Sequence, residues 1–272
     1  MARLFELELL GGTAERRYRS MRPEVEAMPW STLDPARYPQ ASVIAARAAW
    51  TAAAYQEHRT GAACAATLRA LIEAQAPLDL VAMATRFPLD EMVHVELCAR
   101  MAMALGGGTE INYEPDALIL DADRSFPALV RATELVIRVF CVGEAISIPL
   151  LRGTMRAAKH PLPRAVLGRI VRDEAAHGAF GWLYLDWALP QITDPTERAH
   201  LDRVADDAIV AVQRLWAHLR ARPRTERCEI DIWAAMDTDA YLAEAERSLA
   251  RNVLAPLRAR GVKVTKAPPP PA

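Results

Sequence analysis

Asp90-Glu91-Met92-Val93-His94 and Asp173-Glu174-Ala175-Ala176-His177 are two copies of one five-residue pattern, Asp-Glu-x-x-His. Residues three apart on an α-helix leave the same face one turn apart, so the glutamate and histidine of each copy can bind one metal ion together. Each copy is preceded by a further glutamate in a long apolar stretch, Glu57 and Glu144. Four glutamates and two histidines are the ligand inventory of a carboxylate-bridged two-metal site in a four-helix bundle.

The apolar, alanine-rich stretches around these residues predict four long helices, each ended by proline or glycine. We expect them at about residues 41–75, 78–105, 126–159 and 164–189. The non-helical connection 106–125 can reach about 60 Å at roughly 3.3 Å per residue, enough to pass along a whole helix. One such crossover is the ferritin-like topology. The midpoints of the four helices fall close to the proposed ligands, so helices lying side by side would bring these residues to one level.

The rest of the chain is expected to surround this bundle within the same all-α domain. Prolines punctuate the N-terminal segment, which should be irregular and wrap the bundle, and two more amphipathic helices should follow the bundle. The proline-rich end should be a disordered tail. The predicted limits are 1–40 for the wrapping segment, 41–190 for the four-helix bundle, 191–262 for the two extra C-terminal helices and 263–272 for the tail.

Composition narrows the possible classes of protein. The chain has 272 residues, of which 52% are hydrophobic, and a formal net charge of −1, so it can bury a sizeable core and has no charge that favours nucleic acid or an anionic membrane surface. No stretch of about 18 residues is free of charge, so no membrane span is expected. The four cysteines are widely spaced, which argues against a zinc ribbon or a disulfide framework and fits a reducing compartment. We expect a cytoplasmic monomer or homodimer.

The two upstream glutamates differ in their surroundings. Glu144 is flanked almost wholly by apolar residues, and an isolated buried carboxylate costs several kcal/mol unless it is paired or bound to a cation. The alternative partner for Glu144 is an arginine, Arg138 or Arg152. Glu57 has more polar neighbours, so its alternative is a solvated surface position, and Glu73 is the alternative ligand on the same helix.

The chemistry of the set indicates the metal. Four carboxylates balance the charge of two divalent ions, and oxygen and imidazole ligands suit iron or manganese better than zinc or an iron–sulfur cluster. Six ligands for two ions leave open positions at which dioxygen or a substrate can bind. Asp90 and Asp173 are expected to accept hydrogen bonds from the second ring nitrogen of the ligand histidines, across the site, because such imidazoles usually donate to a carboxylate. Their alternative is an ordinary surface position.

Residues one turn from the ligands define a candidate substrate pocket, which is mostly apolar, as expected for a cavity that shields an oxidant. The alternative is that they are ordinary core residues, because any helix bundle requires an apolar stripe. These residues are Trp50, Ala54, Thr60, Cys98, Phe140, Cys141, Ile148 and Phe180.

The complete pattern resembles the ferritin-like di-iron carboxylate superfamily over about residues 41–190. The resemblance implies two iron ions, or manganese with iron, and dioxygen as co-substrate. It also implies that Glu91 and Glu174 bridge the metals. The residues that it implies as metal ligands and catalytic centre are Glu57, Glu91, His94, Glu144, Glu174 and His177.

The same resemblance implies an oxygenase or oxidase that acts on a small organic substrate, with an external electron donor. Hydroxylation, N-oxygenation, desaturation and oxidative C–C cleavage all occur among such enzymes. Arylamine N-oxygenases carry an extra metal histidine where this chain has Ile170, and ribonucleotide reductase small subunits place a radical tyrosine where it has Cys98. Two alternatives remain, a ferroxidase or iron-storage protein without an organic substrate, and a metal-free bundle that serves as an interaction module.

Overall fold

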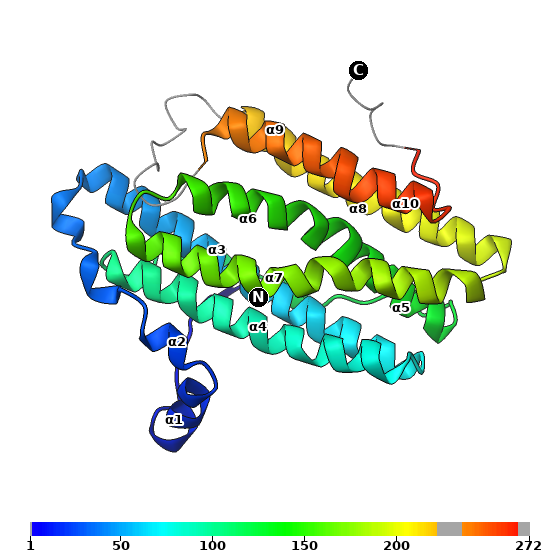
Figure 1. Ribbon diagram of the computed structural model, residues 1–272, viewed down its shortest axis with the longest axis horizontal. Helices are drawn as coiled ribbons and strands as arrows, with labels where there is room; N and C mark the ends of the chain where they lie inside the picture. Colours follow the sequence, from blue (N-terminus) through cyan, green and yellow to red (C-terminus); the bar gives the residue numbers. More distant parts are fainter. Residues whose placement is uncertain (1, 222–235, 266–272) are drawn as a thin grey trace.

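The computed structural model describes residues 2–221 and 236–265, and within them the chain is all-α apart from one pair of two-residue strands (Figure 1). Strand β1, Arg3–Leu4, pairs antiparallel with β2, Asn112–Tyr113. Across these described residues, no helix combines the length and the apolar character that crossing a lipid bilayer requires. The prediction of an all-α fold is therefore confirmed.

Four long helical segments form the centre of the molecule (Figure 1). Three of the segments begin directly after a proline, and the fourth begins with a proline that follows a histidine. Proline is tolerated at a helix start because the backbone N–H that it lacks would have no partner within the helix there. Helix α3 lies against α4 and α5, and α7 lies against α4 and α6, so the four segments surround a common interior. The segments are α3, Gln40–Glu73; α4, Leu78–Ala104; α5, Ala128–Val136, continued by η4, Ile137–Glu144, and α6, Ala145–Ala157; and α7, Pro161–Ala188.

The predicted long crossover is present between the second and third segments. Short turns join α3 to α4 and α6 to α7, so neighbours along the chain run antiparallel there. The connection after α4 instead returns along the length of the helices before α5 begins, as the colours of Figure 1 show. It holds β2 and the short helix η3, Pro115–Leu118, and β2 fixes it to the N-terminal strand.

The third segment differs from the uniform α-helix expected at 126–159. Ile137–Glu144 is a π-helical stretch, with one α-helical part before it and one after it. Glu144 is its last residue. A π-turn inserts one residue into a helix and so changes which face the next side chain leaves, and such turns are frequent at functional sites.

The N-terminal segment is more ordered than the irregular wrap expected for residues 1–40. It contains helix α1, Gly12–Ser20, and it contacts the bundle through a nearly fully buried arginine, Arg22, which forms an ion pair with Glu96 of α4. The Tyr18 hydroxyl also donates to the Met92 carbonyl at 3.3 Å. The further short helices are α2, Pro23–Glu26; η1, Trp30–Thr32; and η2, Pro35–Arg37.

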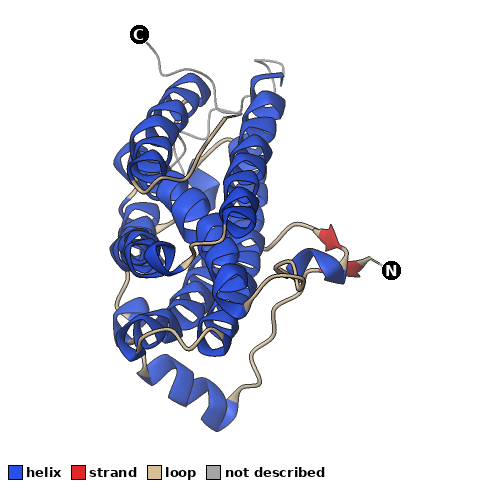
Figure 2. Ribbon diagram, turned by 90° about the vertical axis from the view of Figure 1, so that its right-hand side faces the viewer, coloured by secondary structure: helices blue, strands red, loops and turns tan. Residues whose placement is uncertain are grey.

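The C-terminal helices form a layer along α5, η4 and α6 (Figures 1 and 2). The chain after them is ordered further than predicted, since the backbone N–H groups of Lys263 and Thr265 donate to Asp202 and Asp206 of α8. The expected disorder from residue 263 is therefore wrong for residues 263–265, while 222–235 and 266–272 lie outside the described residues. The elements are η5, Leu189–Gln191; α8, Pro195–Ala221; α9, Thr238–Ser248; the π-helical η8, Leu249–Leu254; and α10, Ala255–Ala259.

Candidate metal centre

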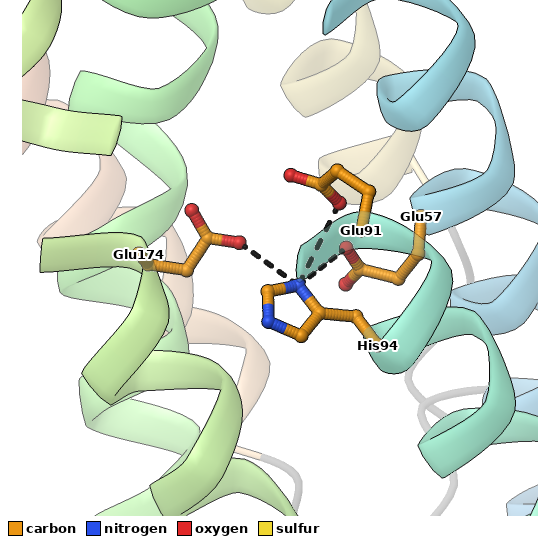
Figure 3. A group of neighbouring side chains, drawn as sticks. All are labelled: Glu57, Glu91, His94 and Glu174. Atoms are coloured by element: carbon orange, nitrogen blue, oxygen red, sulfur yellow. Dashed lines mark ion pairs between the residues drawn. The ribbon is translucent and has the colours of Figure 1, made fainter. Parts of the chain in front are cut away.

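The six proposed ligands lie together at the middle of the four helical segments. Their ligand atoms form two groups, and within each group all atoms lie within 4.8 Å of one another. One group joins Glu57 of α3 with residues of α4 and α7 (Figure 3). The other joins Glu144 with the same two helices. The first group is Glu57, Glu91, His94 and Glu174; the second is Glu91, Glu144, Glu174 and His177.

Glu91 and Glu174 belong to both groups and divide their oxygens between them. Glu91 places Oε2 at 3.6 Å from Nδ1 of His94 and Oε1 at 3.2 Å from Nδ1 of His177. Glu174 does the same, with Oε1 at 3.3 Å from His94 and Oε2 at 3.0 Å from His177. A carboxylate that offers one oxygen to each of two adjacent positions has the geometry of a bridge between two cations.

Glu57 and Glu144 each complete one group. The Glu57 carboxylate lies 3.6 Å from Nδ1 of His94 and its side chain is 14% exposed, so it points inward. Glu144 is buried and accepts a hydrogen bond from Ser147 Oγ at 3.0 Å. Arg138, which could have paired with Glu144, instead lies 3.3 Å from Glu134.

Glu73 and Arg152 also lie away from the six ligands. Glu73 is 44% exposed and forms ion pairs with Arg69 and Arg131, so it does not replace Glu57 as the ligand from α3. Arg152 occupies the wall of a surface pocket between α6 and α7. Among the described residues, no arginine is paired with Glu144.

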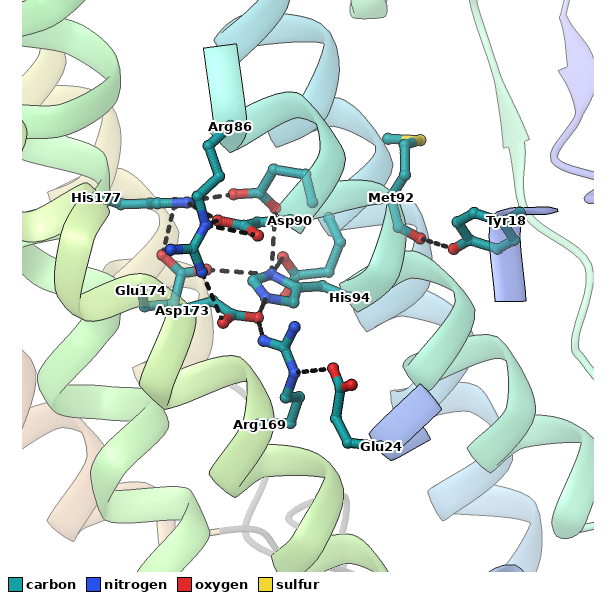
Figure 4. A network of polar contacts seen from close by, with 12 residues as sticks. Tyr18, Glu24, Arg86, Asp90, Met92, His94, Arg169, Asp173, Glu174 and His177 are labelled. Atoms are coloured by element: carbon teal, nitrogen blue, oxygen red, sulfur yellow. Dashed lines mark hydrogen bonds and ion pairs between the residues drawn. The ribbon is translucent and has the colours of Figure 1, made fainter. Parts of the chain in front are cut away.

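Each of the two aspartates contacts the histidine of the other Asp-Glu-x-x-His copy. Asp173 of α7 accepts from Nε2 of His94 on α4 at 3.2 Å, and Asp90 of α4 lies 3.5 Å from Nε2 of His177 on α7 (Figure 4). Both carboxylates are nearly fully buried, so they are not ordinary surface acids. The outer nitrogen of each ring thus lies beside an aspartate, and Nδ1 of both histidines faces the two shared glutamates, Glu91 and Glu174.

Two arginines anchor these aspartates. Arg86 Nε lies 2.9 Å from Asp90 and its Nη2 lies 3.3 Å from Asp173, so one guanidinium spans both (Figure 4). Arg169 forms an ion pair with Asp173 and a 3.1 Å hydrogen bond to Glu24 in the N-terminal segment. The arrangement therefore links the wrapping segment to the orientation of an imidazole.

Burial separates the pKa values of the glutamates. It raises the pKa of Glu57 to about 8, and it raises the pKa of Glu144 well above its usual value, with the charges of Glu174 and Glu91 adding to the effect. Burial acts in the same direction on Glu174, but His177 and His94 outweigh it and lower its pKa to about 2. Burial therefore favours the neutral form of Glu57 and Glu144, whereas the two imidazoles favour the charged form of the shared glutamate Glu174.

The pKa values of the two histidines are raised, because the neighbouring carboxylates favour the protonated, charged form of the imidazole. Burial lowers the pKa of His177, but Asp90, Glu174 and Glu91 outweigh it and raise the pKa to about 12. The pKa of His94 is likewise raised well above its usual value, because the surrounding glutamates outweigh burial. Without metal, protonated imidazoles thus balance charged glutamates in this cluster, and divalent cations would displace protons when they bind.

Several buried ligand atoms in the centre are in ion-pair contact with one another but form no well-aligned hydrogen bond within the described part of the chain. They include both oxygens of Glu91, Oε2 of Glu174, Nδ1 of both histidines and Nε2 of His177. Buried polar atoms normally form hydrogen bonds, and atoms that converge without them need an explanation such as an ion. Carboxylate oxygens and ring nitrogens that converge in this way fit a pair of divalent cations of the iron or manganese type.

Aromatic rings close the centre on one side. The ring centroids of Phe87 and His177 lie 4.3 Å apart, and Phe87 also contacts Phe140 and Phe180. Phe140 and Phe180 were expected to line a substrate pocket, but their positions are those of core residues. These rings shield His177 from water.

The remaining residues of the predicted pocket lie in different surroundings. Thr60 is partly exposed, and its hydroxyl donates to the Gln56 carbonyl of its own helix at 3.1 Å. Ile148 lines the surface pocket between α6 and α7. The others are packed in the core, as the apolar stripe of any helix bundle would be. They are Trp50, Ala54, Cys98 and Cys141.

Sequence reasoning missed four contributors to the centre. Cys64 is buried beside it, and burial together with the charges of Glu91 and Glu144 raises the pKa of its thiol. It lies seven residues after Glu57, two helical turns along one face, which could have identified it. The other three are Arg86, Arg169 and Phe87. The two arginines stand four residues before each aspartate, so the repeat is in fact Arg-x-x-x-Asp-Glu-x-x-His.

Comparison of the chain with protein-family models, with curated proteins and with solved structures gave no match. What the centre can do therefore follows from its own geometry and chemistry.

Proposed function

We propose that this chain is a ferritin-like di-iron carboxylate protein that uses dioxygen to oxidise a small organic substrate. The observation that carries the proposal is the pair of four-residue ligand groups that share Glu91 and Glu174. Two ligand groups that share two carboxylates support two metal ions rather than one. The single long crossover between the second and third helical segments supports the ferritin-like assignment.

In this proposal each residue has a defined task. Glu57 and His94 would hold one ion, Glu144 and His177 would hold the other, and the shared carboxylates of Glu91 and Glu174 would contribute to both. Asp90 and Asp173 keep both rings turned so that Nδ1 faces inward. The chemistry that these side chains cannot perform, electron transfer to dioxygen, would be supplied by two ferrous ions when bound.

The surroundings suit an oxidation that must exclude water. Phe87, Phe140 and Phe180 cover the His177 side, and Glu91 is fully buried. A closed, apolar environment protects a strong oxidant from solvent and from side reactions. The substrate outcome stays open among hydroxylation, N-oxygenation, desaturation and C–C cleavage. Insertion of one oxygen atom would require two electrons from an external donor, while the second atom leaves as water.

Metal analysis followed by rapid mixing tests the proposal. Anaerobic loading with ferrous iron should give about two ions per chain, and mixing with dioxygen should produce a transient visible absorbance. The matched control is Glu91→Gln, which keeps the side-chain shape but removes a shared carboxylate. A protein that binds no iron under these conditions, or binds it equally well in the variant, would show that the centre is not a di-iron site.

Rapid mixing together with a measurement of molecular size distinguishes the proposed enzyme from an iron-handling protein. A ferroxidase would turn over repeatedly with added ferrous iron and accumulate a ferric core in a large symmetric shell. The proposed enzyme should instead elute as a monomer or dimer, and the decay of its transient should respond to one organic compound. Size-exclusion chromatography with light scattering distinguishes the two.

A further inference from the structure

A surface pocket of about 280 Å³ lies between α6, α7 and the C-terminal layer. It is separate from the ligand cluster but adjacent to it. Its walls come from α6, α7, the π-helical η8 and the start of α10. The residues that line it include Ala145, Ile148, Arg152, Ala175, Gly178, Trp182, Arg251 and Asn252.

The inner wall of this pocket is directly connected to the proposed metal ligands. Three of its residues each follow a ligand in sequence: Ala145, Ala175 and Gly178. All three have small or absent side chains, which leaves room for the pocket beside the two helices. Ile148 lies one turn after Glu144, and a Cβ on Gly178 would stand only 2.6 Å from Ile148 Cδ1. Ile148 therefore packs against α7 at Gly178, the residue that follows the proposed ligand His177.

The outer part of the pocket carries positive charge. Arg152 and Arg251 both line it, both are exposed, and no acidic residue of the described chain does so. Within residues 2–221 and 236–265, neither guanidinium has an ion-pair partner. Arg131, which lies in α5 at the other end of the third helical segment, is by contrast paired with Glu73 at 3.1 Å. Two unpaired guanidinium groups at one apolar pocket indicate a site for an anion.

The rest of the lining gives the ligand an apolar body. Trp182 and Ile148 provide apolar walls, and the amide of Asn252 donates from Nδ2 to Ser248 Oγ at 3.1 Å, which fixes this side chain at the rim. Guanidinium groups bind carboxylates in a planar, two-point geometry. An apolar body with one carboxylate therefore matches the pocket better than a fully hydrated inorganic anion.

We propose that this pocket binds the organic substrate, and that the substrate is a small monocarboxylate with an apolar body. Arg152 and Arg251 hold the carboxylate, and the apolar end lies against Ile148, toward Glu144. The claim that the bound ligand is a substrate rests on the proposed function. The binding itself does not depend on metal or dioxygen, so it can be tested separately.

Binding of benzoate and of its neutral analogue benzamide to the full chain tests the proposal. Isothermal titration without metal and with anaerobic ferrous iron should detect benzoate, and benzamide should bind at least about tenfold more weakly because it lacks the charge. The double variant Arg152→Gln/Arg251→Gln should lose at least about tenfold in benzoate affinity, and each single variant should lose part of it. Circular dichroism of each variant checks that it is folded.

The control is Arg156→Gln/Arg258→Gln, which makes the same charge change on α6 and α10 outside the pocket. It should retain benzoate binding. Equal loss in both double variants would show a non-specific charge effect and overturn the proposal. Two further results would also overturn the proposal. One is inorganic phosphate that binds the chain as tightly as benzoate, and the other is no benzoate binding at all. Normal iron loading of the wild-type chain alongside any of these results would leave the metal proposal standing.

Discussion

Glu91 and Glu174 each serve both ligand groups, whereas Glu57 and Glu144 each serve one. Replacing a shared ligand should therefore cost more metal than replacing a single-group ligand. We expect Glu91→Gln to bind well under one iron per chain and Glu57→Gln to keep about one, because its second group stays complete. Metal analysis after anaerobic loading and desalting measures this.

The matched control for that comparison is Glu73→Gln on the same helix as Glu57. Glu73 is exposed and paired with Arg131, so its loss should leave the metal content unchanged. Equal metal loss in the Glu91 and Glu57 variants would contradict the bridging assignment.

Asp173 acts through His94 rather than on the metal. Its 3.2 Å contact with Nε2 fixes the ring, and Arg86 and Arg169 fix the aspartate in turn. Asp173→Asn should lower metal affinity about 10–100-fold while keeping the stoichiometry, because partners of a ligand imidazole contribute on this scale. Titration with manganese measures it. Asp186→Asn, an exposed aspartate of the same helix, should leave the affinity unchanged, and a similar loss there would exclude the proposed role.

At the scale of residues, the sequence predicted convergence of the ligands because two identical spacings and two upstream glutamates constrain each other. It did not predict the role of Arg86, because an arginine four residues before an aspartate also suits an ordinary exposed ion pair. It left the pocket undecided, because the position of Phe140 or Cys98 one turn from a ligand does not say whether a neighbour fills the space. That depends on side chains from other helices.

Among the elements, the π-helical segment η4 makes an unusually close contact with α7. A Cβ on Gly181 would lie 2.8 Å from Cys141 Sγ and 2.9 Å from Phe140 Cβ, and the Cys141 backbone nitrogen is also near. Gly181→Ala should therefore push η4 away, destabilise the protein by about 1–3 kcal/mol and weaken binding at the Glu144 group. Urea unfolding and metal titration measure the two effects.

Gly168→Ala is the control for that change. Its Cβ would have its nearest neighbour, Met155 Sδ, at 3.7 Å, which is an ordinary contact. In a helix interior this substitution should stabilise by about 0.4–1 kcal/mol. If Gly181→Ala stabilised the protein to the same degree, the close contact would not constrain η4.

The long helices could be predicted to within a few residues because proline and glycine mark their ends, as Pro77 and Pro127 do. The π-helical stretch Ile137–Glu144 could not, since apolar residues on all faces give no periodicity from which a one-residue insertion can be recognised. Order in the N-terminal segment was also missed. It comes from tertiary contacts such as Arg22 with Glu96, whereas the prolines alone suggested a loop.

At the scale of the whole molecule, the centre should make the stability of the metal-free protein depend on pH. The pKa of His177 is about 12 in the folded state against an ordinary 6.5, and that of Glu57 is about 8 against 4.5. Above the ordinary values the folded state holds protons that the unfolded state has released, so the free energy of unfolding falls as pH rises through this range. Glu174, with a pKa of about 2, acts oppositely: its contribution is complete above its ordinary 4.5 and is lost as the pH falls from there toward 2.

The metal-free protein should therefore be most stable near about pH 5–6 and have a lower Tm at about pH 8.5. Bound cations replace the protons of His177 and Glu57, so metal affinity rises with pH and loading with manganese should remove most of the loss. Thermal unfolding at both pH values, with chelator or with manganese, measures this. The variant Glu57→Gln has no proton to lose at that position and should show a smaller fall. A metal-free Tm that rises from pH 6 to 8.5 would mean that the buried imidazoles are neutral and that the charge balance described for the centre is wrong.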